Sequence, residues 1–316
     1  MRIILELTEN KTRVASLKMR MSVLGSGSGG NATILECGDV CLLIDAGLSA
    51  KQLTIRMEKI GVNPDELTGI LLTHEHSDHA RGLDVLLRKR NIPVYANAMT
   101  KEALQWGMKS EVQWKVFNTG QDFVLEGLSV HPFPIPHDAA EPVGFTLEKD
   151  AVKFGLVTDV GYVTQAMRMH LKAADALFVE SNYDEELLEA DTKRPWSTKQ
   201  RISSRHGHLS NTQAGELIAD VGCGRLGHVV LGHLSGDCNC PIVATRTVND
   251  LLCSEGLTDV NVFCANQSDP TEWVEFGVVV EKVVEETVTA PKVAAVKVEE
   301  IQLAPVDGKL LQVDLF

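Results

Sequence analysis

The segment His74-Glu75-His76-Ser77-Asp78-His79 restricts what this chain can fold into more than any other feature. It places three histidines and an aspartate within six residues, directly after an apolar strand predicted at residues 69–72. Imidazole and carboxylate groups are ligands that suit zinc, manganese and iron. Four ligands are too many for a single catalytic metal, which also needs an open position. The spacing therefore predicts a loop that is shared by two divalent metal ions.

Strands and helices alternate around this loop. Besides 69–72, strand patterns occupy residues 21–24, 32–36, 40–44, 93–96, 128–133, 143–147, 152–157, 176–179, 228–232, 260–263 and 276–280. Helix patterns occupy residues 49–60, 80–89, 100–106, 164–173, 212–220 and 243–253, and Ser210 with Gln213 has the spacing of a capping box. This interleaving predicts an α+β protein in which two sheets pack together with helices outside.

The glycine-rich segment Gly25–Gly30 matches the dinucleotide-binding pattern G-x-G-x-x-G. That pattern indicates a dinucleotide site only where a helix follows it. Residues 32–36 have the pattern of a strand instead, so we reject the dinucleotide interpretation. We interpret the segment as a hairpin turn whose backbone also approaches a ligand closely.

The first eighteen residues are charged and have no apolar core, so they do not resemble a signal peptide. We interpret residues 1–18 as an N-terminal extension, with Met19 or Met21 as alternative starts of the protein. No long apolar run occurs, which predicts the absence of a membrane span and a cytoplasmic protein with seven reduced cysteines. Residues 19–281 are expected to form one catalytic domain. Residues 282–316, rich in Val, Ala, Glu and Lys, are predicted to be a flexible tail.

The net charge of −13 argues, taken alone, against a nucleic-acid partner. Part of this charge, −3, lies in the tail from Glu281 onward, and cations bound at the metal site would invert the field of the acids there. One stretch is basic, because Thr192 to His208 contains five cations and no acid. Within it we expect Lys199, Arg201 and Arg205 to contact nucleic acid.

The order of the motifs resembles that of the metallo-β-lactamase superfamily. The matching pieces are Asp45 at a strand end, the His74–His79 block, His137 in Pro136-His137-Asp138, Asp159 in Thr158-Asp159-Val160-Gly161, and His233 in Leu231-Gly232-His233-Leu234-Ser235. The resemblance covers residues 20 to 280 and implies a four-layer αββα sandwich with hydrolase activity.

The resemblance also implies a role for each residue. Six side chains would bind the metals, three each: His74, His76 and His137 for the first, and Asp78, His79 and His233 for the second. Asp159 would bridge the two metals, and a carboxylate at this place is typical of the phosphodiesterase and glyoxalase-like branches. Asp45 is expected to orient the ligands from behind, and Glu180, at the end of a predicted strand, is a candidate for the same role. Replacement of Asp78 is expected to abolish turnover.

Four segments resemble the YycJ/WalJ family in particular: Ser22–Asn31, Leu72–His79, Gly207–Asn211 and Gly232–Ser235. This family implies 5′→3′ exonuclease action on DNA, linked to mismatch repair. Related phosphodiesterases carry a histidine near the position of His208 that contacts the scissile phosphate, so His208 is a candidate general acid. The alternative is a histidine that caps the following helix, and His206 is a weaker candidate for the acid.

Other potential ligands are interpreted as structural. These are His131, His170 and His228, together with Cys238 and Cys240, which follow the last motif and for which reduced thiols are favoured over metal ligands.

The chain ends Gln312-Val313-Asp314-Leu315-Phe316, which resembles the short motif by which bacterial repair and replication proteins bind the DNA polymerase sliding clamp. Gln312 would supply a polar anchor, while Leu315 and Phe316 would fill an apolar pocket. Binding through this tail to a clamp that already encircles DNA would raise the local concentration of an acidic enzyme at DNA. The alternative is a final strand that packs on the protein's own core.

Two rival functions are consistent with the same metal site. One is a small-molecule hydrolase that acts on a lactone, a thioester or a cyclic phosphodiester. The other is a non-catalytic scaffold that binds the clamp, against which the intact set of ligands argues.

Overall fold

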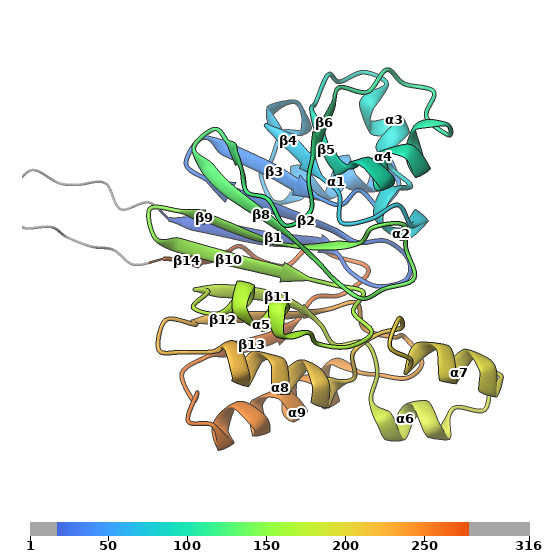
Figure 1. The fold of residues 1–316 in the computed structure, drawn as a ribbon, viewed down its shortest axis with the longest axis vertical. Helices are drawn as coiled ribbons and strands as arrows, with labels where there is room; N and C mark the ends of the chain where they lie inside the picture. The colour runs from blue at the N-terminus through green and yellow to red at the C-terminus, as the bar shows by residue number, and fades with distance from the viewer. Residues whose placement is uncertain (1–17, 278–316) are drawn as a thin grey trace, which may run out of the picture. The chain divides into compact units, whose positions relative to one another are not determined.

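The computed structural model describes residues 18–277. Most of the predicted N-terminal extension, and the tail with its Gln312–Phe316 motif, lie outside the described residues. Two β-sheets lie face to face, and helices cover the outer side of each (Figure 1). The predicted α+β architecture, a four-layer αββα sandwich, is therefore confirmed.

The first sheet has seven strands in the order β14-β1-β2-β3-β4-β5-β6. Its strands are β1 (Met19–Gly25), β2 (Ala32–Cys37), β3 (Val40–Ile44), β4 (Gly69–Leu71), β5 (Val94–Asn97), β6 (Trp114–Phe117) and β14 (Val274–Phe276). The strands β3 to β6 are parallel to one another, whereas β1 and β2 form an antiparallel hairpin. The hairpin turn predicted at Gly25–Gly30 is the connection between them.

The second sheet also has seven strands, in the order β13-β12-β11-β10-β9-β8-β7. Its strands are β7 (Phe123–Leu125), β8 (Leu128–Pro134), β9 (Val143–Lys149), β10 (Val152–Val157), β11 (Ala176–Glu180), β12 (His228–Gly232) and β13 (Asn261–Cys264). Strands β10 to β13 are parallel, and β7 to β10 are antiparallel neighbours.

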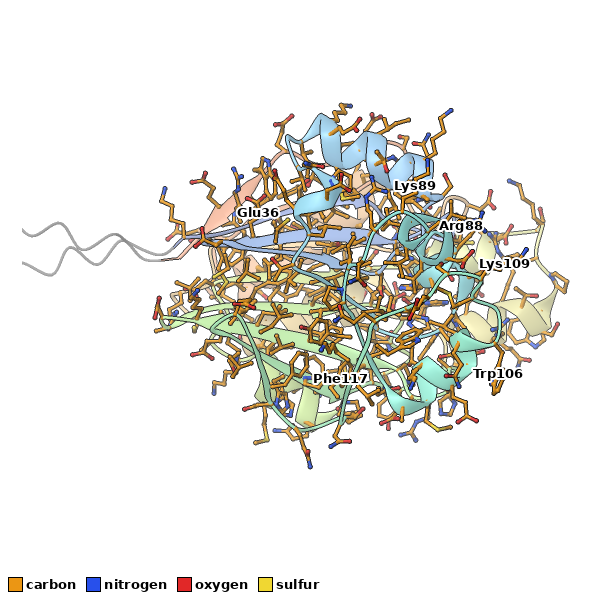
Figure 2. All side chains as sticks on the ribbon, turned by 90° about the horizontal axis from the view of Figure 1, so that it is seen from above. Glu36, Arg88, Lys89, Trp106, Lys109 and Phe117 are labelled. Atoms are coloured by element: carbon orange, nitrogen blue, oxygen red, sulfur yellow. The ribbon has the colours of Figure 1, made fainter. Side chains whose placement is uncertain are left out.

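Three apolar clusters join the four layers. Between the sheets, inward side chains such as Met21, Phe145 and Phe154 are fully buried. The helices of the first sheet are α1 (Ala50–Lys59), η1 (Pro64–Glu66), α2 (Ser77–Ala80), α3 (Leu83–Leu87) and α4 (Ala98–Gln105). Those that follow in the chain are α5 (Gln165–Leu171), α6 (Glu185–Ala190), α7 (Trp196–Ile202), α8 (Asn211–Val221) and α9 (Pro241–Ser254). Residues of α1 and α3 pack on one outer face, and those of α5, α8 and α9 on the other. Charged side chains such as Lys89 and Lys109 project outward instead (Figure 2).

The structure departs from the predicted elements in two places. The helix predicted at residues 80–89 is two short helices, α2 and α3, because the chain turns at Gly82. A Cβ atom on Gly82 would lie 2.1 Å from the carbonyl oxygen of Leu48, so only glycine fits this turn. The last predicted strand, 276–280, is found at Val274–Phe276, and residues 278–280 lie outside the described range.

The topology brings the carboxyl ends of several strands to one edge of the sandwich. Parallel pairing aligns the ends of β3 and β4 in the first sheet and of β10, β11 and β12 in the second. Strand β8 joins this set because it is antiparallel to β9, which is itself antiparallel to β10. Every predicted metal-binding motif follows one of these strands, so the motifs meet at this edge.

Candidate metal centre

The first group of potential metal ligands consists of His74, His76 and His137, each of which offers a ring nitrogen within 4.8 Å of the others. Thr73 Oγ1 lies 3.0 Å from Nδ1 of His74 and donates its proton to Asp45, so it accepts a hydrogen bond from that nitrogen. This leaves Nε2 of His74 buried without a hydrogen-bond partner. A buried, unprotonated ring nitrogen that no protein group satisfies is the feature expected of a metal ligand.

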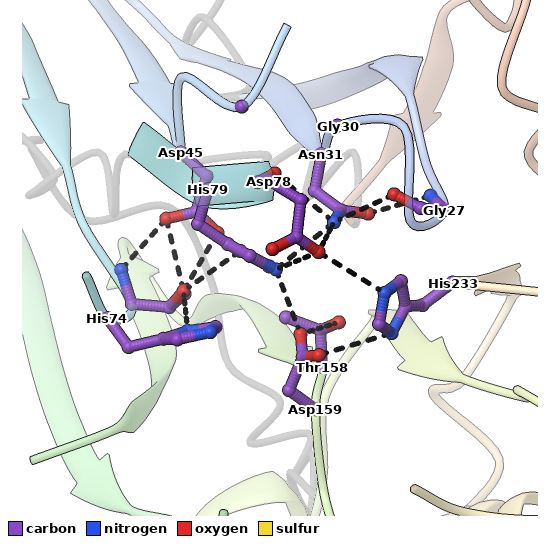
Figure 3. A network of polar contacts seen from close by, with 12 residues as sticks. Gly27, Gly30, Asn31, Asp45, His74, Asp78, His79, Thr158, Asp159 and His233 are labelled. Atoms are coloured by element: carbon purple, nitrogen blue, oxygen red, sulfur yellow. Dashed lines mark hydrogen bonds and ion pairs between the residues drawn. The ribbon is translucent and has the colours of Figure 1, made fainter. Parts of the chain in front are cut away.

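The second group consists of Asp78, His79, Asp159 and His233 (Figure 3). Oδ2 of Asp159 lies 3.1 Å from Nε2 of His79, and Oδ1 lies 3.8 Å from Nε2 of His137 in the first group. Nε2 of His233 faces Oδ2 of Asp78 at 3.6 Å. Oδ1 of Asp159 also lies 3.3 Å from Nδ1 of His233, so the carboxylate stands between the two groups, as a bridging carboxylate would.

Asp45 supports the loop from behind. Its Oδ2 accepts a hydrogen bond from Nδ1 of His79 at 2.7 Å, and its Oδ1 accepts the backbone N–H of Thr73 at 2.9 Å. Nε2 of His79 is thereby turned toward Asp159. Sequence reasoning missed Thr73, because its contacts depend on the pairing of β3 with β4 and not on any local pattern.

Glu180, fully buried at the end of β11, contacts two histidines at once. Its Oε1 lies 2.8 Å from Nδ1 of His233 and 2.7 Å from Nδ1 of His208, while its Oε2 accepts the backbone N–H of Val160 at 2.8 Å. The helix that follows is capped by Ser210, with the predicted capping box to Gln213, so the capping role considered for His208 is wrong.

The carboxylates of the centre favour positive charge on the groups beside them. Burial opposes the charged form of His233, but the Asp159 carboxylate outweighs it and raises the pKa of His233 to about 10. Burial likewise opposes charge on His79, and Asp159 and Asp45 raise its pKa well above the usual range. The pKa of Asp159 is held well below its usual range against burial, chiefly by His233 and His79. By contrast, burial lowers the pKa of His74, which keeps its ring neutral and able to bind a metal.

Three residues of the centre adopt backbone conformations that are rare for side chains of their kind. Asp45, Asp159 and His233 have φ values of 61°, 58° and 53°. Each such residue costs on the order of 1–3 kcal/mol unless its surroundings impose the conformation, and such residues concentrate at functional sites. Asp45 and His233 directly follow β3 and β12, and Asp159 stands two residues after the end of β10, so the three left-handed residues lie at strand ends.

The glycine-rich turn connects the centre to the first sheet. The backbone N–H of His233 donates to Oγ of Ser26 at 2.7 Å, and Nδ2 of Asn31 lies 3.1 Å from Nε2 of His79. A Cβ atom on Gly30 would lie 2.4 Å from the carbonyl oxygen of Gly47. Gly30 therefore approaches neighbouring backbone, whereas Gly27 and Gly29 approach the side chain of Gln267; the expected approach to a ligand stays a prediction.

The predicted nucleic-acid contacts and the potential ligands interpreted as structural lie outside the two ligand groups. Arg201 forms an ion pair with Asp138 at 2.6 Å, Arg205 lies over the ring of Tyr162 at 4.4 Å, and Nζ of Lys199 donates to the carbonyl oxygen of Glu189. Cys238 and Cys240 are free thiols, and the ligand clusters found among residues 18–277 contain no cysteine. The rings of His131 and His170 stack on each other outside those clusters.

Residues 41–234 match the family model described as the beta-lactamase superfamily domain. Exodeoxyribonuclease YycJ of Bacillus anthracis is 38% identical to the chain over 254 residues, which cover 80% of this chain and 96% of the relative. The chain belongs to the metallo-β-lactamase superfamily and, within it, to the YycJ/WalJ family. Exodeoxyribonuclease WalJ of Streptococcus pneumoniae serotype 2 (strain D39 / NCTC 7466) is 37% identical over 243 residues, which cover 75% of this chain and 90% of the relative.

The fold of this YycJ/WalJ-family member is also found in experimentally solved structures. The metallo-β-lactamase fold protein YhfI from Bacillus subtilis superposes with a TM-score of 0.61 at 17% identity, covering 81% of this chain and 99% of that one. The family and the cluster of histidines and aspartates identify the chain as a metal-dependent hydrolase. Between residues 18 and 277, none of the helices has the length and apolar character that a membrane span requires.

Proposed function

We propose that this YycJ/WalJ-family chain is a two-metal phosphodiesterase that removes nucleotides from DNA in the 5′→3′ direction. The single observation that carries the proposal is Asp159, whose carboxylate lies between the two ligand groups and approaches histidines of both. The curated relatives YycJ and WalJ, both named exodeoxyribonucleases, support DNA as the substrate. A dinuclear site suits phosphodiester hydrolysis because two cations can stabilise both the attacking and the leaving oxygen.

The donor set fits two divalent cations of the zinc, manganese or iron type. His74, His76 and His137 would hold one, and Asp78, His79 and His233 the other, with Asp159 between them. Bound there, the cations would supply Lewis-acid stabilisation of the phosphate oxygens and an acidified water. The chain's own contribution is to hold the ligands in place through Asp45, Thr73 and Glu180.

His208 is the proposed general acid for the leaving oxygen. Its Nδ1 is directed to Glu180, so Nε2 is the ring nitrogen left to face a substrate. Burial opposes its charged form, but Glu180 outweighs burial and raises the pKa of His208, which keeps a proton available on the ring. A proton donor at this place would protonate the departing 3′ oxygen of the released nucleotide.

The first test is digestion of 5′-phosphorylated double-stranded DNA, labelled at the 5′ end in one reaction and at the 3′ end in another, with manganese or zinc. The wild type is expected to release the 5′ label as a mononucleotide at once and to shorten the 3′-labelled strand stepwise. Asp78→Asn should do neither, whereas Asp39→Asn, in the exposed turn after β2, is the matched control. Turnover of a small thioester or lactone without DNA cleavage would instead favour the small-molecule hydrolase.

A role in mismatch repair with recruitment by the sliding clamp is the second part of the proposal. It rests on the terminal sequence Gln312–Phe316, which lies outside the described residues. Deletion of the last five residues is expected to abolish binding to a purified bacterial clamp while nuclease activity on free DNA is kept. The control is a full-length variant in which the last five residues are kept but placed in scrambled order, and it should also fail to bind the clamp. Equal clamp affinity of the truncated and full-length chains would refute recruitment.

A further inference from the structure

The segment 185–208, the α6–α7 arm, buries little apolar surface: Leu188 of α6 and the partly buried Ile202 of α7 pack on Tyr183 and Cys238. Every residue of α7 (Trp196–Ile202) is partly or fully exposed, and Trp196 is 70% exposed. Isolated helices this short are not stable in water, so contacts with the body must hold the arm. Ion pairs do so at both ends of α7, between Arg194 and Asp237 at 3.0 Å and between Arg201 and Asp138 at 2.6 Å.

The arm is joined directly to the metal centre. Asp138, the partner of Arg201, follows His137 in the sequence, and the carbonyl oxygen of Gly207 lies 3.3 Å from Nδ1 of His137. A Cβ atom on Gly161, two residues after Asp159, would lie 2.3 Å from the backbone of Arg205. Figure 1 shows α6 and α7 projecting beyond the sandwich at the end where α2 lies. A strand bound along this arm would therefore reach the centre.

The exposed groups of the arm have the chemistry of a single-strand binding surface. Lys199 stands one helical turn after Trp196, so the two side chains share a face of α7. In the part of the chain that the structure describes, neither Lys199 nor Arg205 has a carboxylate partner within ion-pair distance. Surfaces that bind unpaired DNA combine cations for the phosphates with aromatic rings on which bases stack.

We propose that the α6–α7 arm binds the unpaired end of the DNA strand being degraded, with the ring of Trp196 stacked on a base and Lys199 near a phosphate. This rests on the proposed exonuclease function and specifies that the strand end is separated from its complement, as a single strand or at an opened duplex end, when it reaches the metal centre.

The test compares Trp196→Ala, Trp196→Phe and Trp106→Ala with the wild type on two substrates. Trp106 is the matched control because it is 84% exposed and lies at the end of α4, on the other side of the sandwich. The substrates are a 5′-phosphorylated single-stranded oligonucleotide and bis(p-nitrophenyl) phosphate, which has no base to stack. Trp196→Ala is expected to raise the KM for the oligonucleotide at least about fivefold, in line with the stacking of one base.

Three further results complete the expectation: kcat on the oligonucleotide changes little, hydrolysis of the small ester is unchanged, and Trp196→Phe recovers most of the affinity. A wild-type KM in Trp196→Ala would overturn the proposal for the arm while leaving the exonuclease function intact. A raised KM in Trp106→Ala alone would also overturn it and would move the strand to α4. If the wild type cleaved only the small ester, the exonuclease function and the arm's role would both fail.

Discussion

Oδ2 of Asp45 lies 2.7 Å from Nδ1 of His79, on the side of the ring opposite the nitrogen that faces Asp159. A carboxylate in this position fixes both the tautomer and the orientation of a metal-binding imidazole. The contact spans 34 residues of sequence and forms because β3 and β4 are parallel neighbours whose ends coincide. The sheet therefore determines where the imidazole of His79 points.

Replacing Asp45 by Asn is expected to weaken metal binding without removing a ligand. The amide keeps the shape of the carboxylate but loses the negative charge that holds the His79 N–H, and losses of about 10- to 100-fold in metal affinity are typical of such changes. Metal affinity can be measured by competition with a chelating dye. Asp39→Asn, in the exposed turn after β2, should bind metal as the wild type does. Equal affinity of the two variants would contradict the role given to Asp45.

His208→Ala is expected to lower kcat on DNA by about 10²- to 10⁴-fold, the usual range for loss of a general acid. The loss should be much smaller on bis(p-nitrophenyl) phosphate, because nitrophenolate leaves without protonation. Glu180→Gln should add a loss on both substrates, since Oε1 of Glu180 contacts Nδ1 of the proposed metal ligand His233 as well as Nδ1 of His208. Measuring kcat for both substrates separates the acid role of His208 from a structural one, which would lower both values equally.

Gly47→Ala should destabilise the loop that carries the ligands. A Cβ atom there would lie 1.6 Å from the carbonyl oxygen of Asp78, which the neighbouring backbone N–H of Asn31 already contacts at 2.7 Å. Overpacking of this kind costs about 1–3 kcal/mol, and here it also displaces a metal ligand. Thermal unfolding with metal present measures the effect. Gly224→Ala, where a Cβ atom has no neighbour within 4 Å, is the matched control and should unfold like the wild type.

The environment of Asp84 predicts that the free energy of unfolding varies with pH, whether or not metals are bound. Its Oδ1 accepts the backbone N–H groups of Lys109 and Ser110 at 2.7 and 2.9 Å. Hydrogen bonds from the Ser110 side chain and from Arg88 lower the pKa of Asp84. A carboxylate whose pKa is lowered by folding stabilises the protein above the pKa of the unfolded chain, about 3.9, and loses that contribution as the pH falls below it.

The free energy of unfolding of Asp84→Asn should therefore lie about 1–2 kcal/mol below that of the wild type at pH 7, as for hydrogen bonds to a charged group. The gap should narrow at pH 3, because there the Asp84 carboxyl of the unfolded wild type takes up a proton while that of the folded protein stays ionised. Urea denaturation at the two pH values measures it. A gap that is unchanged or wider at pH 3 would show that the charge of Asp84 does not contribute.

The sequence predicted what repeating patterns and motifs encode. The strands around the centre are apolar and bounded by turns, and the ligands stand directly after them, so the four-layer fold and the clustering of His74, Asp159 and His233 could be anticipated. Strand β6 was missed because two of its four residues are exposed, which removes the alternation. Helix α7 was missed because it buries no residue and so has no helical periodicity.

Contacts between distant segments could not be predicted in this way. Thr73 is an ordinary strand residue until β3 and β4 pair and bring Asp45 to it. In the sequence Glu180 is one more acid at a strand end, yet in the structure one of its oxygens, Oε1, contacts both His208 and His233. The partners of the basic stretch, Asp138 and Asp237, are likewise remote in sequence from Arg201 and Arg194.

The central claim is that activity needs two metal ions with Asp159 between them. It is tested by titrating the metal-stripped protein with Mn²⁺ while bound metal and nucleotide release are measured together. Nucleotide release from 5′-phosphorylated DNA is expected to begin only as the second ion binds and to reach its plateau at two ions per chain. His74→Ala should bind one ion tightly and release no nucleotides. Full activity with one ion bound, or in the presence of excess chelator, would contradict a dinuclear exonuclease.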